Sequence, residues 1–104
     1  MSQMMKPFQI VQAVATPTTA ERLATTRGTW AKKVELIAQR VDAANTGDVW
    51  VGVDNTVATG NRIITLEPGD PWDLILPAGY FIDLYDLWID AGTATDGVTG
   101  IRWW

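Results

Sequence analysis

The chain has 104 residues and a formal net charge of −4, and it contains neither cysteine nor histidine. Without cysteine there is no disulfide, thiolate nucleophile or cysteine-ligated zinc, and without histidine the usual general base and the commonest metal ligand are missing. Ser2 is the only serine, so nucleophilic catalysis has almost no side chain to work with. We therefore expect a protein that is not an enzyme and needs no metal or cofactor.

The charged residues divide the chain into a basic and an acidic part. Residues 1–40 carry six basic and two acidic residues, whereas residues 41–104 carry two basic and ten acidic ones. This split suggests a basic segment that meets an acidic surface on a neighbouring copy or another partner, and scattered solvated charge is the alternative. The acidic part argues against nucleic acid as a ligand.

The length predicts one domain. No apolar run reaches the length of about 18 residues that a membrane span needs, and the first residues lack the apolar segment of a secretory signal. We expect a protein made in a cytoplasm, with no membrane partner.

Residues 1–29 predict an extended N-terminal arm with at most one or two edge strands. The segment 8–14 has the composition of a strand, but the threonine-rich segments 16–19 and 25–29 are typical of loops. The arm also holds apolar side chains that lack a core of their own, and we expect them to contact a partner. They are Met4, Met5, Phe8, Ile10 and Val11.

The next segment, residues 29–44, fits two structures. Thr29 could cap a helix in which Val34, Ile37 and Val41 recur at helical spacing. The alternation of Val34, Leu36 and Ala38 also fits a strand. From these residues alone the helix is slightly favoured.

Gly47 and Gly52 have the spacing of the glycines in a phosphate-binding loop. That loop needs lysine and then serine or threonine directly after the second glycine, whereas Val53 and Asp54 follow Gly52 here. We therefore interpret residues 48–53 as a strand between tight turns, entered through Asn45-Thr46-Gly47.

The rest of the chain predicts an all-β fold. Glycines and prolines recur between short runs rich in β-branched and aromatic residues. In Leu87-Trp88-Ile89-Asp90, alternation puts Leu87 and Ile89 inside and Trp88 and Asp90 outside. The predicted core residues are Val34, Leu36, Val49, Val51, Ile64, Leu66, Leu74, Leu87 and Ile89.

Residues 30–104 resemble small virion proteins of tailed bacteriophages. The resemblance rests on turn and core positions: Trp30-x-x-x-Val34-x-Leu36-x-Ala38, Asn45-Thr46-Gly47-x-Val49-x-Val51-Gly52, Gly60, Leu66-x-Pro68-Gly69, Leu87-Trp88-Ile89-Asp90 and Gly97-Val98. It implies a single jelly-roll-like β-sandwich over residues 30–104, preceded by the arm of residues 1–29. It also implies a strand, not a helix, over residues 31–39.

Proteins of this kind serve mainly as head decoration (cement) proteins. The resemblance therefore implies a structural virion protein on the capsid surface, with the major capsid protein as partner. We also expect self-association, with a homotrimer favoured over a dimer. The alternative is a tail or fibre module that binds carbohydrate or a receptor through exposed tryptophan.

The six tryptophans supply most of the remaining contact candidates. Tryptophan is enriched in interface hot spots, although packing in the core is the simpler role for any one ring. Because consecutive strand side chains point to opposite faces, one of the two C-terminal rings should face outward unless a partner covers it. The candidates are Trp30, Trp72, Trp88, Trp103 and Trp104.

Several aspartates could suggest a calcium site, because calcium takes several oxygen ligands. They are Asp70, Asp73, Asp83, Asp86, Asp90 and Asp96. They do not form the acidic loop of an EF-hand, and a solvated acidic surface is the favoured interpretation.

Overall fold

A computed structural model describes residues 6–104, and within them the chain is all-β with only two short 3-10 helices. The strands are β1 (Pro7–Ala13), β2 (Glu21–Arg22), β3 (Trp30–Ala31), β4 (Lys33–Ile37), β5 (Val49–Gly52), β6 (Arg62–Leu66), β7 (Pro71–Ile75), β8 (Ile82–Asp83), β9 (Trp88–Ala91) and β10 (Gly97–Trp103). The 3-10 helices are η1 (Val57–Thr59) and η2 (Leu84–Asp86).

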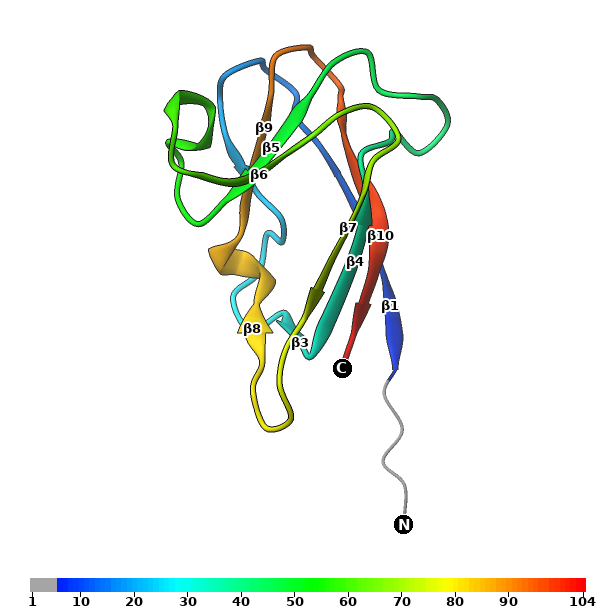
Figure 1. Ribbon diagram of the computed structural model, residues 1–104, viewed down its shortest axis with the longest axis vertical. Helices are drawn as coiled ribbons and strands as arrows, with labels where there is room; N and C mark the ends of the chain where they lie inside the picture. The colour runs from blue at the N-terminus through cyan, green and yellow to red at the C-terminus, as the bar shows by residue number, and fades with distance from the viewer. Residues whose placement is uncertain (1–5) are drawn as a thin grey trace.

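The strands form two four-stranded antiparallel sheets. Sheet A has the order β1-β10-β4-β7, and sheet B has the order β2-β9-β5-β6. Figure 1 shows them as two layers, with β5, β6 and β9 in one and β1, β4, β7 and β10 in the other. In the same view the two-stranded pair β3-β8 lies below β5, β6 and β9, beside the lower end of β4.

The core lies between the two sheets, because buried side chains of both belong to one cluster. Seven of the nine predicted core residues are buried, and Ile64 and Leu74 are half-buried against the cluster. The alternation of apolar and polar residues therefore predicted the core correctly.

Residues 31–39 contain a strand, so the helical interpretation of this segment is wrong. In β4, Val34 and Leu36 are buried, whereas Lys33 and Glu35 alternate with them on the outer face. Each side of β4 pairs with a neighbour, β10 or β7. This pairing satisfies the backbone in an extended conformation, and a local propensity for helix does not outweigh it.

The segment predicted to be an arm is built into both sheets from residue 7. β1 pairs with β10 over its whole length, and β2 pairs with β9. Both are edge strands, as the sequence suggested, but Ile10, Val14 and Leu23 belong to the shared core. The two-layered body thus begins at β1 and not at residue 30. Ile10 is a core residue rather than an exposed contact residue.

Two glycines in β10 allow the neighbouring strands to approach. A Cβ on Gly100 would overlap the carbonyl oxygen of Glu35, and one on Gly97 would overlap the carbonyl oxygen of Gln12. Both obstacles are backbone atoms, which cannot rotate away as a side chain can.

We expect Gly100→Ala to destabilise the protein by about 3 kcal/mol or more, because the added methyl group has to push β4 away from β10. The measurement is urea unfolding followed by tryptophan fluorescence. Gly92→Ala is the matched control, since its Cβ would make only an ordinary 3.7 Å contact with Trp50. Equal stabilities of the two variants would contradict this account of β10.

Candidate interaction surfaces

At one end of the molecule, the exposed ring of Phe81 lies against two other exposed aromatic rings. The ring centroids of Trp30 and Phe81 are 5.2 Å apart, and those of Phe81 and Trp104 are 5.5 Å apart, both in edge-to-face geometry. The exposed fractions are 39% for Trp30, 55% for Phe81 and 37% for Trp104. We call these three residues the aromatic end.

Backbone contacts position the aromatic end. Trp30 lies in β3, which pairs with β8 next to Phe81, and Lys6 and Trp104 exchange two backbone hydrogen bonds of 2.8 and 3.0 Å. Figure 1 shows the C-terminus and the loop between β7 and β8 at the same end of the long axis. Rings from three distant parts of the sequence therefore meet.

The surroundings of the aromatic end are basic. The Nζ of Lys32 lies 5.2 Å from the centroid of the Trp104 ring, and Arg102 donates a 2.7 Å hydrogen bond to the carbonyl oxygen of Trp30. Lys6 is exposed beside Trp104. Such a surface suits a partner that is both apolar and acidic.

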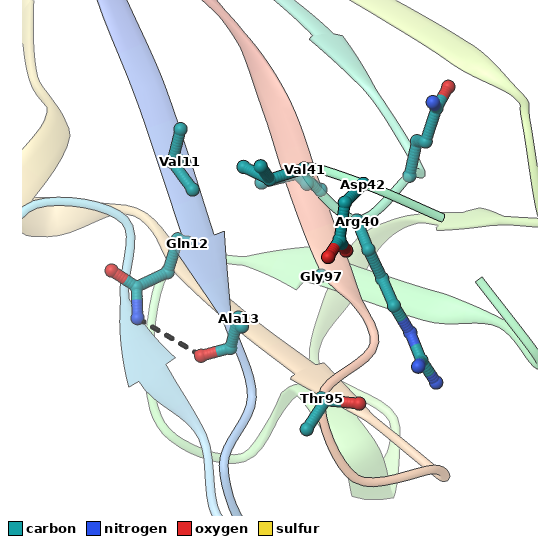
Figure 2. A pocket seen from close by; sticks show the side chains of 10 residues that line it. Val11, Gln12, Ala13, Arg40, Val41, Asp42, Thr95 and Gly97 are labelled. Carbon is teal, nitrogen blue, oxygen red and sulfur yellow. Dashed lines mark hydrogen bonds between the residues drawn. The ribbon is translucent and has the colours of Figure 1, made fainter. Parts of the chain in front are cut away.

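A second surface is the outer side of sheet A, where several aliphatic side chains are exposed, among them four on β1, β10 and the end of β4 and the segment after it. We call these four residues the aliphatic face, and they are Val11, Ile37, Val41 and Ile101. A shallow pocket of about 370 Å³ lies there, between β1 and the segment that follows β4. Figure 2 shows Val11 and Ala13 along β1 on one side of this pocket, with Val41 and Asp42 across from them.

On the outer side of sheet B, arginines cover the aromatic rings. The guanidinium carbon of Arg22 lies 3.7 Å from the ring centroid of Tyr85 and 4.3 Å from that of Trp88. Arg62 lies 4.8 Å from the ring of Trp50 in the same way. These rings are therefore partly occupied by the protein's own cations.

The predicted contact residues do not form one surface. Phe8, Val11, Trp30 and Trp104 are exposed, and Trp88 is half-buried under Arg22. The other predicted residues are Trp72, which packs half-buried against the core, and Trp103, whose indole N–H donates a 2.7 Å hydrogen bond to Glu35. Met4 and Met5 lie outside the described residues.

The sequence reasoning missed Phe81, the central ring of the aromatic end. Phe81 and its neighbour Tyr80 follow the turn of residues 77–79 directly. Two consecutive aromatic residues after a proline- and glycine-containing turn were the available signal, since at least one of them must face away from the core.

The buried carboxylates of Asp83 and Asp96 accept hydrogen bonds from backbone N–H groups. Asp96 accepts hydrogen bonds from the backbone N–H groups of Thr46 and Gly47, at 2.9 and 2.7 Å, and forms a 2.8 Å ion pair with Arg40. Asp83 accepts three backbone N–H groups, those of Gly28, Thr29 and Tyr85. The segment 45–47 is therefore a turn held by Asp96.

The pKa values of Asp83 and Asp96 follow from this arrangement. Burial would raise the pKa of each carboxyl group, but hydrogen bonds from backbone N–H groups and a nearby arginine hold both pKa values below the ordinary value of 3.8. The arginine is Arg27 for Asp83 and Arg40 for Asp96. Among residues 6–104, no group of three or more carboxylates is placed to hold a metal ion.

Asp90 is buried, so the expectation that it points into solvent is wrong. It alternates outward from sheet B, but the chain around Thr18 covers it, and the Thr18 N–H bonds the Ala91 carbonyl oxygen at 3.1 Å. Its Oδ1 accepts a 2.7 Å hydrogen bond from the Ala91 N–H, whereas Oδ2 makes no hydrogen bond within the described part of the chain. Burial raises the pKa of Asp90 against the opposing effect of the Ala91 and Thr18 N–H groups, and the nearby charge of Glu21 adds to the rise.

The chain matches no known protein family, no curated protein and no solved structure. In the described part of the chain, no helix has the length and apolar character needed to cross a membrane.

We expect Asp96→Asn to destabilise the protein by about 3 kcal/mol at pH 7, because it leaves Arg40 and the N–H groups of Thr46 and Gly47 without their charged acceptor. The folded-state pKa of Asp96 is lowered, so its stabilising contribution is complete above about pH 4 and is lost as the pH falls through the folded-state pKa. Urea unfolding at pH 7 and at pH 3 should therefore give a smaller difference between wild type and variant at pH 3. A difference that does not change with pH would contradict this role.

Asp90→Asn should have the opposite effect and stabilise the protein by about 1 kcal/mol at pH 7, since it removes a buried charge with an unpartnered oxygen. The folded-state pKa of Asp90 is raised, so the wild type regains this stability as the pH falls and Asp90 takes up a proton. Urea unfolding at pH 7 and at pH 3 tests whether the variant is more stable than wild type and whether the difference shrinks at low pH. A variant less stable than wild type at pH 7 would show that the charged form of Asp90 is needed.

Proposed function

We propose that this protein is a structural component of a phage virion, a decoration protein that binds the outer surface of the head and stabilises it. Its partner is the major capsid protein, and it is made in the host cytoplasm before it joins the capsid. The proposal combines the resemblance of residues 30–104 to small virion proteins with the arrangement of the strands and the exposed aromatic end.

The strand order supports a jelly-roll sandwich. Among the eight strands of the two large sheets, the first pairs with the last (β1-β10), the second with the seventh (β2-β9), the third with the sixth (β4-β7) and the fourth with the fifth (β5-β6). The chain thus resembles one long hairpin folded over itself, as in the jelly rolls of viral capsid proteins. One fold can serve many functions, so the decoration function has to be argued from the surface residues.

The aromatic end is the observation that carries the proposal. Trp30, Phe81 and Trp104 expose a contiguous set of large rings, and exposed aromatic clusters are typical of binding sites. Lys32 and Arg102 supply the positive rim. We propose that this end contacts an apolar and acidic surface of the capsid protein, and that many such contacts together stabilise the shell.

Carbohydrate binding is the alternative function, and it needs accessible tryptophan faces. Arg22 and Arg62 lie over the rings of Trp88 and Trp50, and Trp30 and Trp104 meet Phe81 edge to face. A flat row of open rings, on which sugars could stack, is therefore not formed by these tryptophans.

The test is to mix the protein with undecorated phage heads and measure its occupancy after the heads are purified. We expect Phe81→Ala to lower the affinity for heads on the order of tenfold or more, because it removes the central ring of the contact. Its folding should change little, since Phe81 lies outside the core cluster. Ile63→Ala is the control, an exposed apolar residue on sheet B.

Wild-type occupancy by the Phe81→Ala variant would rule out the aromatic end as the contact site. If the wild-type protein ignores heads and binds a glycan array instead, the carbohydrate-binding alternative is supported and the decoration function is wrong.

A further inference from the structure

Among residues 6–104, no strand pairs with the outer edge of β1. Lys6 and Trp104 exchange two backbone hydrogen bonds, and at the other end of the strand the Val14 N–H donates to the Asp96 carbonyl oxygen at 2.9 Å. In an antiparallel ladder the bonded pairs alternate, so Phe8, Ile10 and Gln12 bond to β10. The N–H and C=O groups of Gln9, Val11 and Ala13 therefore point away from the sheet.

The other three edges are less suited to pairing. β2 has only two residues, both charged. β7 begins with Pro71, which has no N–H, and carries Asp73 at its centre. β6 begins with Arg62 beside an irregularity in its pairing with β5. Proline, charge and irregular pairing are the features by which proteins protect sheet edges.

β1 has none of these protective features between Phe8 and Ala13. That segment contains no charged residue and no proline, and its pairing with β10 is regular. Its outward side chains, Gln9, Val11 and Ala13, are also exposed, with 47% of Val11 accessible. A regular, uncharged edge of this length is a site for pairing with another strand.

We infer that β1 pairs antiparallel with β1 of a second copy of this chain, around a two-fold axis at Val11. Val11 then lies opposite Val11 of the second copy, and Gln9 lies opposite Ala13. The three residues whose backbone groups point outward face each other, although the Ala13 carbonyl oxygen also accepts a 3.2 Å hydrogen bond from the Gln12 side chain. Pro7, which has no N–H to donate, falls opposite Ala15. The Ala15 N–H already donates a 2.8 Å hydrogen bond to the Glu21 carboxylate, so it needs no acceptor from the second copy.

The side chains favour the same pairing. Val11 belongs to the aliphatic face, and the register places Thr99 and then Ile37 beside it on the outer side of sheet A. Across the two-fold axis, this row would continue into the same row of the second copy. The dimer would thus join two aliphatic faces into one, and two valines directly opposite each other stabilise an antiparallel pair. This inference does not depend on the proposed role in a virion.

The absence of cysteine makes a register-specific test possible. In a hydrogen-bonded antiparallel pair, opposite Cα atoms lie about 5.5 Å apart, which suits a disulfide. We expect the Val11→Cys variant to form a covalent dimer under mild oxidation. Gln9→Cys should not cross-link with itself, because the two copies of residue 9 would lie about 14 Å apart. A mixture of Gln9→Cys and Ala13→Cys should cross-link.

Size-exclusion chromatography with light scattering tests the dimer without cross-links. The wild type should have twice the mass of the chain, and Val11→Lys should be monomeric, because it sets two like charges opposite each other at the axis. Ile63→Lys is the matched control, since Ile63 is an exposed β-branched residue on the edge strand of sheet B, and this variant should remain a dimer.

A wild-type monomer would overturn the inference. So would self-cross-linking of Gln9→Cys as efficient as that of Val11→Cys, or an oligomer that Val11→Lys leaves unchanged. Because none of these measurements uses phage heads, their outcome is separate from that of the decoration experiment.

Discussion

The arrangement of the sheets depends on one cluster of hydrogen bonds around Asp96 and Gly97. The Asp96 carboxylate holds the turn before β5 through Thr46 and Gly47, and the Asp96 carbonyl oxygen accepts the N–H of Val14 at the end of β1. Asn45 adds a reciprocal pair of hydrogen bonds with Gly97 at the start of β10. One point therefore connects the ends of β1 and β10 to the entry of β5, and so joins the register of sheet A to sheet B.

Local patterns in the sequence predicted the strands and the core, but not the partners of the strands. Alternation placed Val34, Leu36, Val49 and Val51 inside, because burial of one sheet face imposes a period of two. The pairing of β1 with β10 joins residues about 90 positions apart, and no local pattern encodes it. The N-terminal segment therefore looked like an arm.

The same limit explains the errors at Asp90 and Phe81. Asp90 follows the alternation and does point outward from sheet B, but the chain around Thr18 covers it. Phe81 is exposed, as its turn suggests, yet its importance comes from contact with Trp30 and Trp104. The period of a strand predicts the direction of a side chain. Whether another segment covers that side chain, or other rings contact it, depends on residues far away in the sequence.

The proposed dimer and the proposed capsid contact use different parts of the molecule. Antiparallel pairing of β1 would direct the two aromatic ends in opposite directions, because Lys6 and Trp104 lie at one end of that strand pair. Such a dimer would reach two separate points on a lattice and bridge them, with a gain from avidity. A closed ring, as expected for a homotrimer, would instead set the basic part of one chain against the acidic part of its neighbour. In the two-fold arrangement the edge of β1 is covered, and both aromatic ends stay free to contact the lattice.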